Sequence, residues 1–255
     1  MILAIANQKG GVGKTTAAIS LAAVWAQAGS PTLLVDMDPQ GNVAAGLGFE
    51  ESLLDLTVAE VLRGECSVEQ AILPTRVDGL SLLPSDIGLA VLEAEELSVD
   101  SLARALTAVA GRYARIVIDC PPSLGRLTLC ALAAAKRVLI PVRAGKFSMV
   151  GLRQLVTTID NIRTRGLNPS LRTLGIFLNE AQVRTNLHQL TEQTLRQTYG
   201  GLVLQTVIPS NVALGEAVTV GDPITVYSPT AAGAAAFRAL AEEVESQWDR
   251  VVRSA

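Results

Sequence analysis

The stretch QKGGVGKTT, residues 8–16, decides the fold, because it joins a short apolar run to a helical pattern through a glycine-rich turn. Glycine tolerates the backbone angles that let successive N–H groups point inward at a chain of phosphates. Lys14 supplies a positive charge for the terminal phosphates, and the Thr15 hydroxyl can ligate Mg²⁺. The helix that follows adds its positive N-terminal end. The segment therefore predicts a phosphate-binding loop made of Lys9, Gly10, Gly11, Val12, Gly13, Lys14, Thr15 and Thr16.

The loop departs from the ordinary pattern at its first position. The common form G-x-x-x-x-G-K-[ST] would place glycine at residue 8, where this chain has Gln8. A second lysine, Lys9, stands instead at the mouth of the loop. Two lysines beside one polyphosphate offset more negative charge than one, which favours phosphate cleavage without an arginine finger. We therefore expect both Lys9 and Lys14 to take part in catalysis.

Two aspartates, Asp36 and Asp38, lie in the stretch VDMDPQGN, residues 35–42, at the end of a second apolar run. Side chains alternate along a strand, so the two carboxylates share a face. The carboxyl ends of parallel strands line the ligand crevice, and both should point at the phosphate site. One would hold a metal-bound water, and the other would orient the attacking water. The alternative is a plain turn, since Asp-Pro and Gln-Gly pairs are common turn formers.

A third acidic residue, Asp119, ends the stretch RIVIDCPP at residues 115–122. This is the form of a Walker B strand, in which apolar residues lead to an aspartate that contacts Mg²⁺ directly or through water. Any buried strand can end in aspartate, and the pattern gains its meaning from the phosphate-binding loop before it. Cys120 is expected to be a small buried residue rather than a reactive thiol.

Short aliphatic runs alternate with longer helical patterns, which predicts βαβ units in a single domain spanning residues 1–255. The fold class is α/β: a P-loop NTPase with a mainly parallel central sheet flanked by helices on both faces. Strands are expected at Ile2–Asn7, Thr32–Asp36, Leu80–Pro84, Ile116–Asp119, Val138–Val142, Leu174–Leu178 and Val203–Ile208. Helices are expected at Lys14–Ala28, Ser98–Ala110, Arg126–Ala135, Ser148–Arg165, Leu187–Tyr199 and Ala231–Val252, with Gly29 and Gly166 as C-terminal caps and only short helices and turns between Gly41 and Leu73.

The amino-acid composition argues against several classes of protein. Three cysteines without a CxxC pair and a single histidine, His188, argue against a disulfide framework, a zinc site and most histidine-dependent hydrolases. The apolar runs are too short for a signal peptide or a membrane-spanning helix, so a cytoplasmic protein is expected. The net charge is −3, yet residues 136–196 carry ten basic residues against three acidic ones. Such asymmetry marks either a surface that faces a polyanion or an ordinary solvated face.

Four segments together resemble the ParA/MinD family of deviant Walker ATPases, over nearly the whole chain. KGGVGKTT is similar to the family's deviant Walker A motif, DMDPQGN to its switch I, IVIDCPPS to its Walker B, and TVIPSNVALGEA, from Thr206, to its adenine-contacting segment. DMDPQGN with VIPSN favours the ParA branch. The resemblance implies that ATP is sandwiched between two subunits and that Lys9 reaches the partner's phosphates. It implies that Asp38 positions water, that Thr15, Asp36 and Asp119 surround Mg²⁺, and that Pro209 and Asn211 lie near adenine.

The same resemblance implies partners. ParA dimers bind double-stranded DNA without sequence preference, and a ParB-like protein stimulates slow ATP hydrolysis, a cycle that segregates chromosomes or plasmids from a nucleoid-associated position. Relatives often carry arginines where this chain has Ser210 and Ala213, so the DNA surface is expected to be rearranged. Arg184 resembles a family arginine linked to DNA. The further candidates for DNA contact are Lys146, Arg163, Arg165 and Arg172.

Other readings of the same motifs remain open. A MinD-like regulator of cell-division position would need a basic amphipathic tail, whereas the C-terminal stretch AEEVESQWDRVVRSA mixes acids throughout and predicts no membrane partner. An ATP-using amide ligase would need a small-substrate pocket that no motif identifies. An iron–sulfur reductase would need a cluster-ligand context that Cys120 and Cys130 lack.

Overall fold

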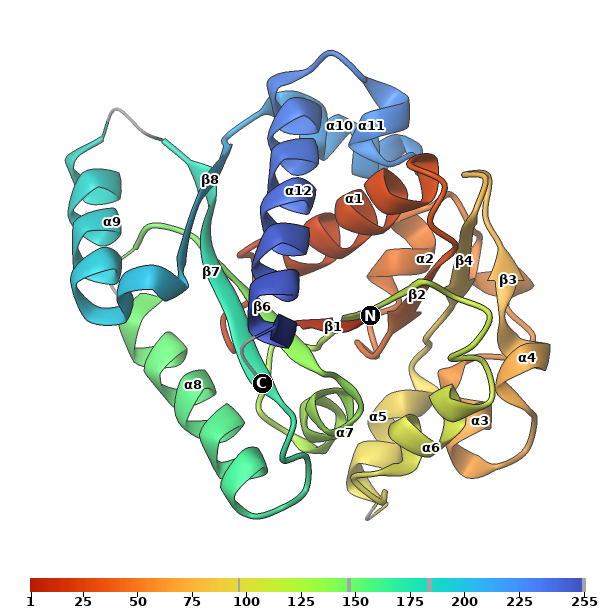
Figure 1. The fold of residues 1–255 in the computed structure, drawn as a ribbon. Helices are drawn as coiled ribbons and strands as arrows, with labels where there is room; N and C mark the ends of the chain where they lie inside the picture. The colour runs from red at the N-terminus through yellow and green to blue at the C-terminus, as the bar shows by residue number, and fades with distance from the viewer. Residues whose placement is uncertain (96, 146–147, 183–184, 254–255) are drawn as a thin grey trace.

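A computed structural model describes residues 1–95, 97–145, 148–182 and 185–253. Its centre is an eight-stranded sheet in the order β3-β4-β2-β5-β1-β6-β7-β8, shown edge-on between layers of helices in Figure 1. Every strand pairing is parallel except that of β3 with β4. The strands are β1 Ile2–Ile5, β2 Thr32–Asp36, β3 Leu73–Pro74, β4 Leu80–Leu83, β5 Arg115–Asp119, β6 Arg137–Val142, β7 Arg172–Ala181 and β8 Val203–Pro209. The expected α/β class with a mainly parallel sheet is confirmed.

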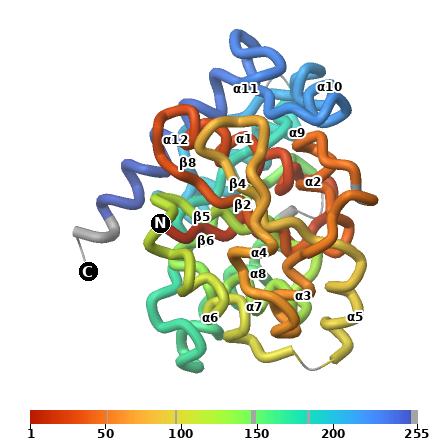
Figure 2. The backbone as a smooth tube through the Cα atoms, turned by 90° about the vertical axis from the view of Figure 1, so that its right-hand side faces the viewer, coloured from red at the N-terminus to blue at the C-terminus, as the bar shows by residue number. Residues whose placement is uncertain are grey.

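Helices cover both faces of this sheet, as Figures 1 and 2 show. The longer ones are α1 Lys14–Gln27, α7 Arg126–Ala134, α8 Ser148–Thr164, α9 Asn186–Tyr199, α10 Val212–Val220 and α12 Ala232–Arg253. The shorter ones are α2 Asn42–Gly46, η1 Glu51–Leu53, α3 Val58–Arg63, α4 Val68–Ala71, α5 Gly88–Ala94, α6 Ser101–Thr107, η2 Gly200–Leu202 and α11 Ile224–Tyr227. Within the described ranges, no helix is both long and apolar enough to cross a membrane.

Two hydrophobic cores form on opposite sides of the sheet. Leu3 and Ile5 of β1 pack with α1, α10 and α12, whereas the intervening Ala4 packs with the layer of α3 and α5 to α8. Successive side chains of a strand point to opposite faces, so a strand covered on both sides is apolar throughout. This is why the interiors of the central strands β1, β2, β5 and β6 appear in the sequence as apolar runs rather than as alternating ones.

All seven expected strands are present, and the expected helices differ mainly at their ends. Gly29 and Gly166 adopt φ values of +80° and +77°, as their predicted capping role requires. The helix expected from Ser98 to Ala110 is shorter, because α6 spans only Ser101–Thr107. The sequence analysis missed α5, α10, α11 and β3, which are either short or so apolar that no amphipathic pattern marks them.

Sheet register brings the predicted acidic residues to one edge. Asp36, the last residue of β2, is the direct partner of Asp119, the last residue of β5, and Asp119 is in turn the partner of Ile5 on β1. The loop from β1 into α1, residues 6–13, begins directly after Ile5. The phosphate-binding loop and both strand-terminal carboxylates therefore meet at the carboxyl edge of the central strands.

Candidate functional site

The start of the glycine-rich loop is tied to a neighbouring strand by Asn7. Its side-chain Nδ2 donates a 2.7 Å hydrogen bond to the carbonyl of Pro141 on β6, and its Oδ1 accepts a 3.0 Å bond from the Lys9 amide. Asn7 is buried, so these bonds fix the angle at which the chain leaves β1. Sequence analysis included Asn7 only as the end of a strand, and nothing local marks its partner on β6.

The end of the loop is held by Asn179, at the carboxyl end of β7. Its Nδ2 donates a 2.8 Å bond to the carbonyl of Val12, while Gly13 takes φ +81° directly beneath it. A β-carbon on Gly13 would collide with that same Nδ2 atom. Gly13 is therefore required twice, by its left-handed backbone and by the close approach of Asn179.

Replacing Gly13 by alanine tests this arrangement. We expect Gly13→Ala to lower ATP affinity by at least about tenfold, because about 1–2 kcal/mol of backbone strain adds to the loss of the Asn179 bond. Gly11→Ala is the matched control, since Gly11 has φ +66° but open space where its β-carbon would lie. Calorimetric titration with Mg-ATP should rank Gly13→Ala well below Gly11→Ala. Equal losses in the two variants would contradict a steric role for Asn179.

The two lysines of the loop occupy different environments. Lys14 is only 7% exposed, and its ammonium donates to the carbonyl of Lys9 at 3.4 Å, curling the loop around the site. Burial lowers the pKa of Lys14, an effect that the nearby Asp119 and Asp38 carboxylates oppose. Lys9 is exposed, and in the described chain no hydrogen bond or ion pair holds its side chain. Lys14 thus serves its own site, and Lys9 is free to reach outward.

Thr15 and Asp119 form the part of the site that suits a magnesium ion. The Thr15 hydroxyl donates a 2.6 Å hydrogen bond to Oδ2 of Asp119. The other oxygen, Oδ1, is buried and has no hydrogen-bond partner among the described residues. Burial raises the pKa of Asp119 well above its usual range, and the nearby Asp36 raises it further. A cation here would satisfy the orphan oxygen and favour the ionised carboxylate, so these residues fit Mg²⁺.

Asp36 and Asp38 do different things, although the sequence places them two residues apart. Asp36 is fully buried, and its two oxygens accept backbone N–H bonds of 2.9 Å from Asp38 and 3.2 Å from Val43. Burial raises the pKa of Asp36 to about 7. Asp38 follows β2, and its Oδ1 accepts from the Gln40 amide at 3.1 Å. Asp36 therefore stabilises the turn through backbone hydrogen bonds, and this turn carries Asp38.

A cavity of about 400 Å³ adjoins the loop on the side of α10. Its lining residues are Thr16, Asn179, Glu180, Ser210, Asn211, Val212, Leu214, Gly215 and Val218. Asn211 caps α10 by accepting a 2.9 Å bond from the Ala213 amide, and Pro209 ends β8 next to Ala181 of β7. The cavity lies where the expected adenine contacts begin. It therefore suits the base of a nucleotide whose phosphates occupy the loop.

Glu180 enters this cavity without having been singled out from the sequence. It adopts φ +49°, unusual for a residue with a side chain, and its carboxylate pairs with Arg143 at 3.0 Å. Glu180 and Asn179 directly follow a predicted strand, as Asp36 and Asp119 end theirs. Their place at a strand's carboxyl end is the signal that could have identified them.

The candidate DNA-binding residues are not all gathered at this edge. Arg163 lies in the last turn of α8 and pairs with Asp160 at 3.1 Å, Arg165 follows that helix, and Arg172 begins β7. These three lie toward the amino-terminal edge of the sheet, opposite the phosphate-binding loop. Lys146 and Arg184 lie outside the described residues.

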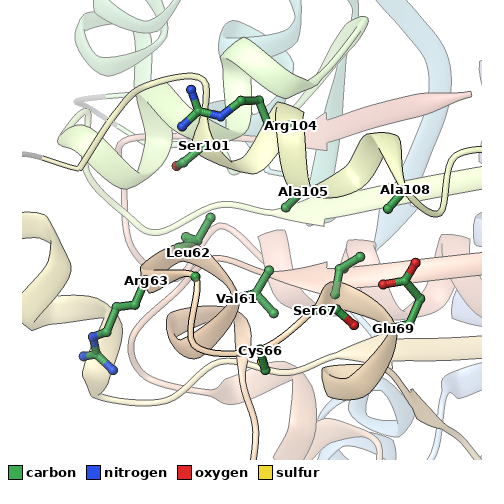
Figure 3. A pocket seen from close by; sticks show the side chains of 12 residues that line it. Val61, Leu62, Arg63, Cys66, Ser67, Glu69, Ser101, Arg104, Ala105 and Ala108 are labelled. Atoms are coloured by element: carbon green, nitrogen blue, oxygen red, sulfur yellow. The ribbon is translucent and has the colours of Figure 1, made fainter.

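A further cavity, of about 480 Å³, is remote from all of these residues. Figure 3 shows it between α6 on one side and α3 and α4 on the other, with Ala105 and Ala108 facing Val61. Its arginines are neutralised, because Arg63 pairs with Glu60 at 3.1 Å and Arg104 pairs with Asp100 at 2.7 Å. None of the candidate site residues predicted from the sequence lines this cavity.

Comparison with known proteins finds a matching family model and relatives that include ParA and Soj. A family model described as "AAA domain" matches residues 1–173. The chain is 42% identical over 248 residues to the chromosome partitioning protein ParA of Myxococcus xanthus, covering 95% of this chain and 87% of that protein. It is 42% identical over 247 residues to the sporulation initiation inhibitor protein Soj of Bacillus subtilis, covering 95% and 97%.

Solved structures agree on the fold. The cobyrinic acid a,c-diamide synthase of Mycobacterium smegmatis, with a bound ATP analogue and magnesium, superposes with a TM-score of 0.85 at 34% identity, covering 97% of this chain and 95% of that one. The septum site-determining protein MinD of Pyrococcus horikoshii, complexed with Mg-ADP, gives a TM-score of 0.81 at 26% identity, covering 95% of each chain. Both neighbours carry a magnesium-bound adenine nucleotide.

Proposed function

This chain belongs to the ParA/MinD family of P-loop ATPases, and from that premise we propose that it acts as a DNA-partitioning ATPase of the ParA branch. In this proposal it dimerises with ATP, binds double-stranded DNA without sequence preference, and segregates DNA together with a ParB-like partner. The observation that carries the proposal is the meeting of the glycine loop with Asp38 and Asp119 at one sheet edge, in a chain similar to ParA and Soj over 95% of its length.

ATP binding follows from the geometry of the loop. The loop amides between Gly10 and Thr15 surround the phosphates, and Lys14 contributes a buried ammonium. Thr15 and Asp119 would hold Mg²⁺, which when bound neutralises phosphate charge. The adenine would occupy the cavity next to Asn211, and Pro209 fixes the strand end from which that segment departs.

Hydrolysis would depend on groups from both subunits. Asp38 is nearly buried beside Lys14, where its carboxylate can orient the attacking water. The exposed Lys9 would complete the charge only when a second copy of the chain brings its own phosphates within reach. A single subunit therefore lacks part of its catalytic charge, which explains why we propose slow turnover that a partner accelerates.

The proposed DNA surface draws on the excess of basic residues between residues 136 and 196. Ser210 and Ala213 stand where relatives often carry arginine, so Arg184 is the main candidate, followed by Lys146. Arg163, Arg165 and Arg172 would contact DNA only if it extended to the opposite edge of the sheet. DNA binding of this kind would give the protein a cytoplasmic, nucleoid-associated position.

Charge reversal at Arg184 tests this surface. We expect Arg184→Glu to weaken DNA binding in ATP by at least about tenfold, because a phosphate contact is replaced by repulsion. Nucleotide affinity should not change. Arg76→Glu is the matched control, since it makes the same charge change at an exposed arginine outside the basic segment. Gel-shift titrations of the two variants with one DNA duplex decide the point. If Arg184→Glu binds DNA with the affinity of the wild-type protein, the DNA surface lies elsewhere.

One comparison tests the proposed function as a whole. Size-exclusion chromatography and a DNA-binding assay should be run side by side with ADP, ATP and a slowly hydrolysed ATP analogue. We expect a monomer without DNA affinity in ADP, and a dimer that retains DNA in ATP or the analogue. A chain that stays monomeric and ignores DNA with every nucleotide would contradict the proposal.

A MinD-like role in positioning cell division is the second candidate, favoured by the similarity to MinD of Pyrococcus horikoshii. It predicts ATP-dependent sedimentation with lipid vesicles in place of DNA retention. An ATP-using amide ligase, the class suggested by the name of the Mycobacterium smegmatis neighbour, predicts neither. The same purified protein can be tested against vesicles and DNA in one series.

A further inference from the structure

Basic residues gather at the sheet edge opposite the nucleotide site. Arg115 begins β5, Arg137 begins β6 directly after Lys136, and Arg172 begins β7. The register makes Arg137 the partner of both Leu3 on β1 and Arg172 on β7. Parallel strands begin at the same edge, so these cations lie along one edge of the sheet, with β1 between Arg115 and Arg137, although more than fifty residues of sequence separate the first from the last.

A cavity of about 390 Å³ opens at this edge. It is lined by Met1, Ile2, Ala110, Tyr113, Ile116, Lys136, Arg137 and Trp248. Trp248 comes from the last turns of α12, which Figure 2 shows on the same side of the molecule as the chain's first residues. Its ring lies 5.3 Å from the Arg137 guanidinium. The cavity thus has two cations and two aromatic side chains in its wall.

Arg137 is a buried cation that forms no ion pair with a carboxylate of the described residues. It is only 8% exposed, and its Nη1 donates to the carbonyls of Lys136 at 2.8 Å and Ser170 at 3.2 Å. Its Nε is buried without a hydrogen-bond partner, and no acidic side chain of the described residues forms an ion pair with it. A buried, unpaired charge is expensive, and proteins normally pair it or supply a ligand.

Other arginines of this chain form ion pairs with carboxylates. Arg115, one strand over from β1, forms a 2.8 Å ion pair with Glu245 beside an adjoining cavity that Asp249 also lines. Both arginines of the cavity in Figure 3 are likewise paired with carboxylates. Arg137 differs because it is more deeply buried than these residues and, among the described residues, has backbone carbonyls and an aromatic ring beside it but no ion-pair partner.

We propose that this cavity binds a phosphate dianion, either inorganic phosphate or a phosphate monoester, with Arg137 as its anchor and Lys136 at its mouth. Two cationic side chains suit a ligand that carries more than one negative charge, as phosphate does near neutral pH. The Arg137 guanidinium lines the cavity and offers planar N–H donors of the kind that bind phosphate oxygens. Trp248 and Tyr113 would flank the rest of a monoester. This site is separate from the nucleotide site and does not rest on the proposed function.

Trp248 reports on the site directly, because the chain has only one other tryptophan, Trp25, buried under α12 on α1. Inorganic phosphate should be titrated at constant ionic strength while Mg-ADP saturates the glycine loop. We expect a saturable change in tryptophan emission that disappears in Trp248→Phe. Arg137→Gln should weaken phosphate affinity by at least about tenfold, in line with the loss of a charge-assisted pair. Arg172→Gln, one strand away and exposed, should leave the affinity unchanged.

A second variant covers the case in which Arg137→Gln does not fold. Lys136 is exposed, so Lys136→Gln should fold normally and lower phosphate affinity several-fold. Absence of a saturable response in the wild-type protein would overturn the proposal, as would equal affinities in the wild type, Lys136→Gln and any folded Arg137→Gln. A response to a DNA duplex but not to inorganic phosphate would also overturn it, and would assign this edge to DNA.

Discussion

Lys14→Ala is expected to lower the affinity for Mg-ATP by at least about a hundredfold. The ammonium of Lys14 is nearly buried and bonded to the Lys9 carbonyl, so it is already in place before the phosphates arrive. Truncating one member of a buried, hydrogen-bonded charge pair costs about 2–5 kcal/mol. In this variant the phosphates would face the Asp119 and Asp38 carboxylates without the Lys14 ammonium, whose positive charge interacts with both.

Calorimetric titration with Mg-ATP measures this loss. The control is Lys9→Ala, which removes the same charge from the same loop at an exposed position. We expect Lys9→Ala to keep nearly the wild-type affinity in the monomer and to fail only in the nucleotide-dependent dimer. Thermal melts without nucleotide check that both variants are folded. An unchanged affinity in folded Lys14→Ala would contradict the assignment of the glycine loop as the phosphate site.

Asp38→Ala is expected to slow ATP turnover by about two to three orders of magnitude, within the range for loss of a positioned acid–base group. ATP affinity should be preserved, because within the described part of the chain the Asp38 side chain makes no hydrogen bond to the loop. Its Oδ1 accepts from the Gln40 amide, and the turn itself is held by Asp36 and by the 2.6 Å bond from Ser85 to the Asp38 carbonyl. The variant should therefore accumulate as an ATP-bound dimer.

Asp38→Asn separates the charge of Asp38 from its place in the turn. The amide can still accept the hydrogen bond from Gln40 through its oxygen, but it cannot orient water as a carboxylate does. We expect Asn and Ala at this position to slow phosphate release equally and to elute as dimers in ATP. Rescue by Asn would limit Asp38 to shaping the turn, and normal turnover in Asp38→Ala would remove it from catalysis.

Much of this protein can be predicted from local sequence. The glycine loop, DMDPQGN and the Walker B strand are each contiguous, and their spacing within an alternating α/β pattern indicated the ParA/MinD family before any coordinates. The central strands β1, β2, β5 and β6 could be predicted because burial on both faces makes their interiors apolar. The roles of individual site residues, Lys9 and Asp38 above all, stay predictions that the variants above can decide.

What the sequence determined by itself is the set of chemical groups and the edge of the sheet where they meet, because each acidic motif lies at the carboxyl end of a predicted strand and parallel strands end at the same edge. Only the tertiary structure decided which groups support them: Asn7 bonded to β6, Asn179 above Gly13, and Asp36 turned into the backbone while Asp38 remains presented. It also placed Arg137 beside Trp248 with no carboxylate partner among the described residues. These pairings join residues up to 167 positions apart, and no local pattern encodes them because they arise only when separate strands and helices pack together.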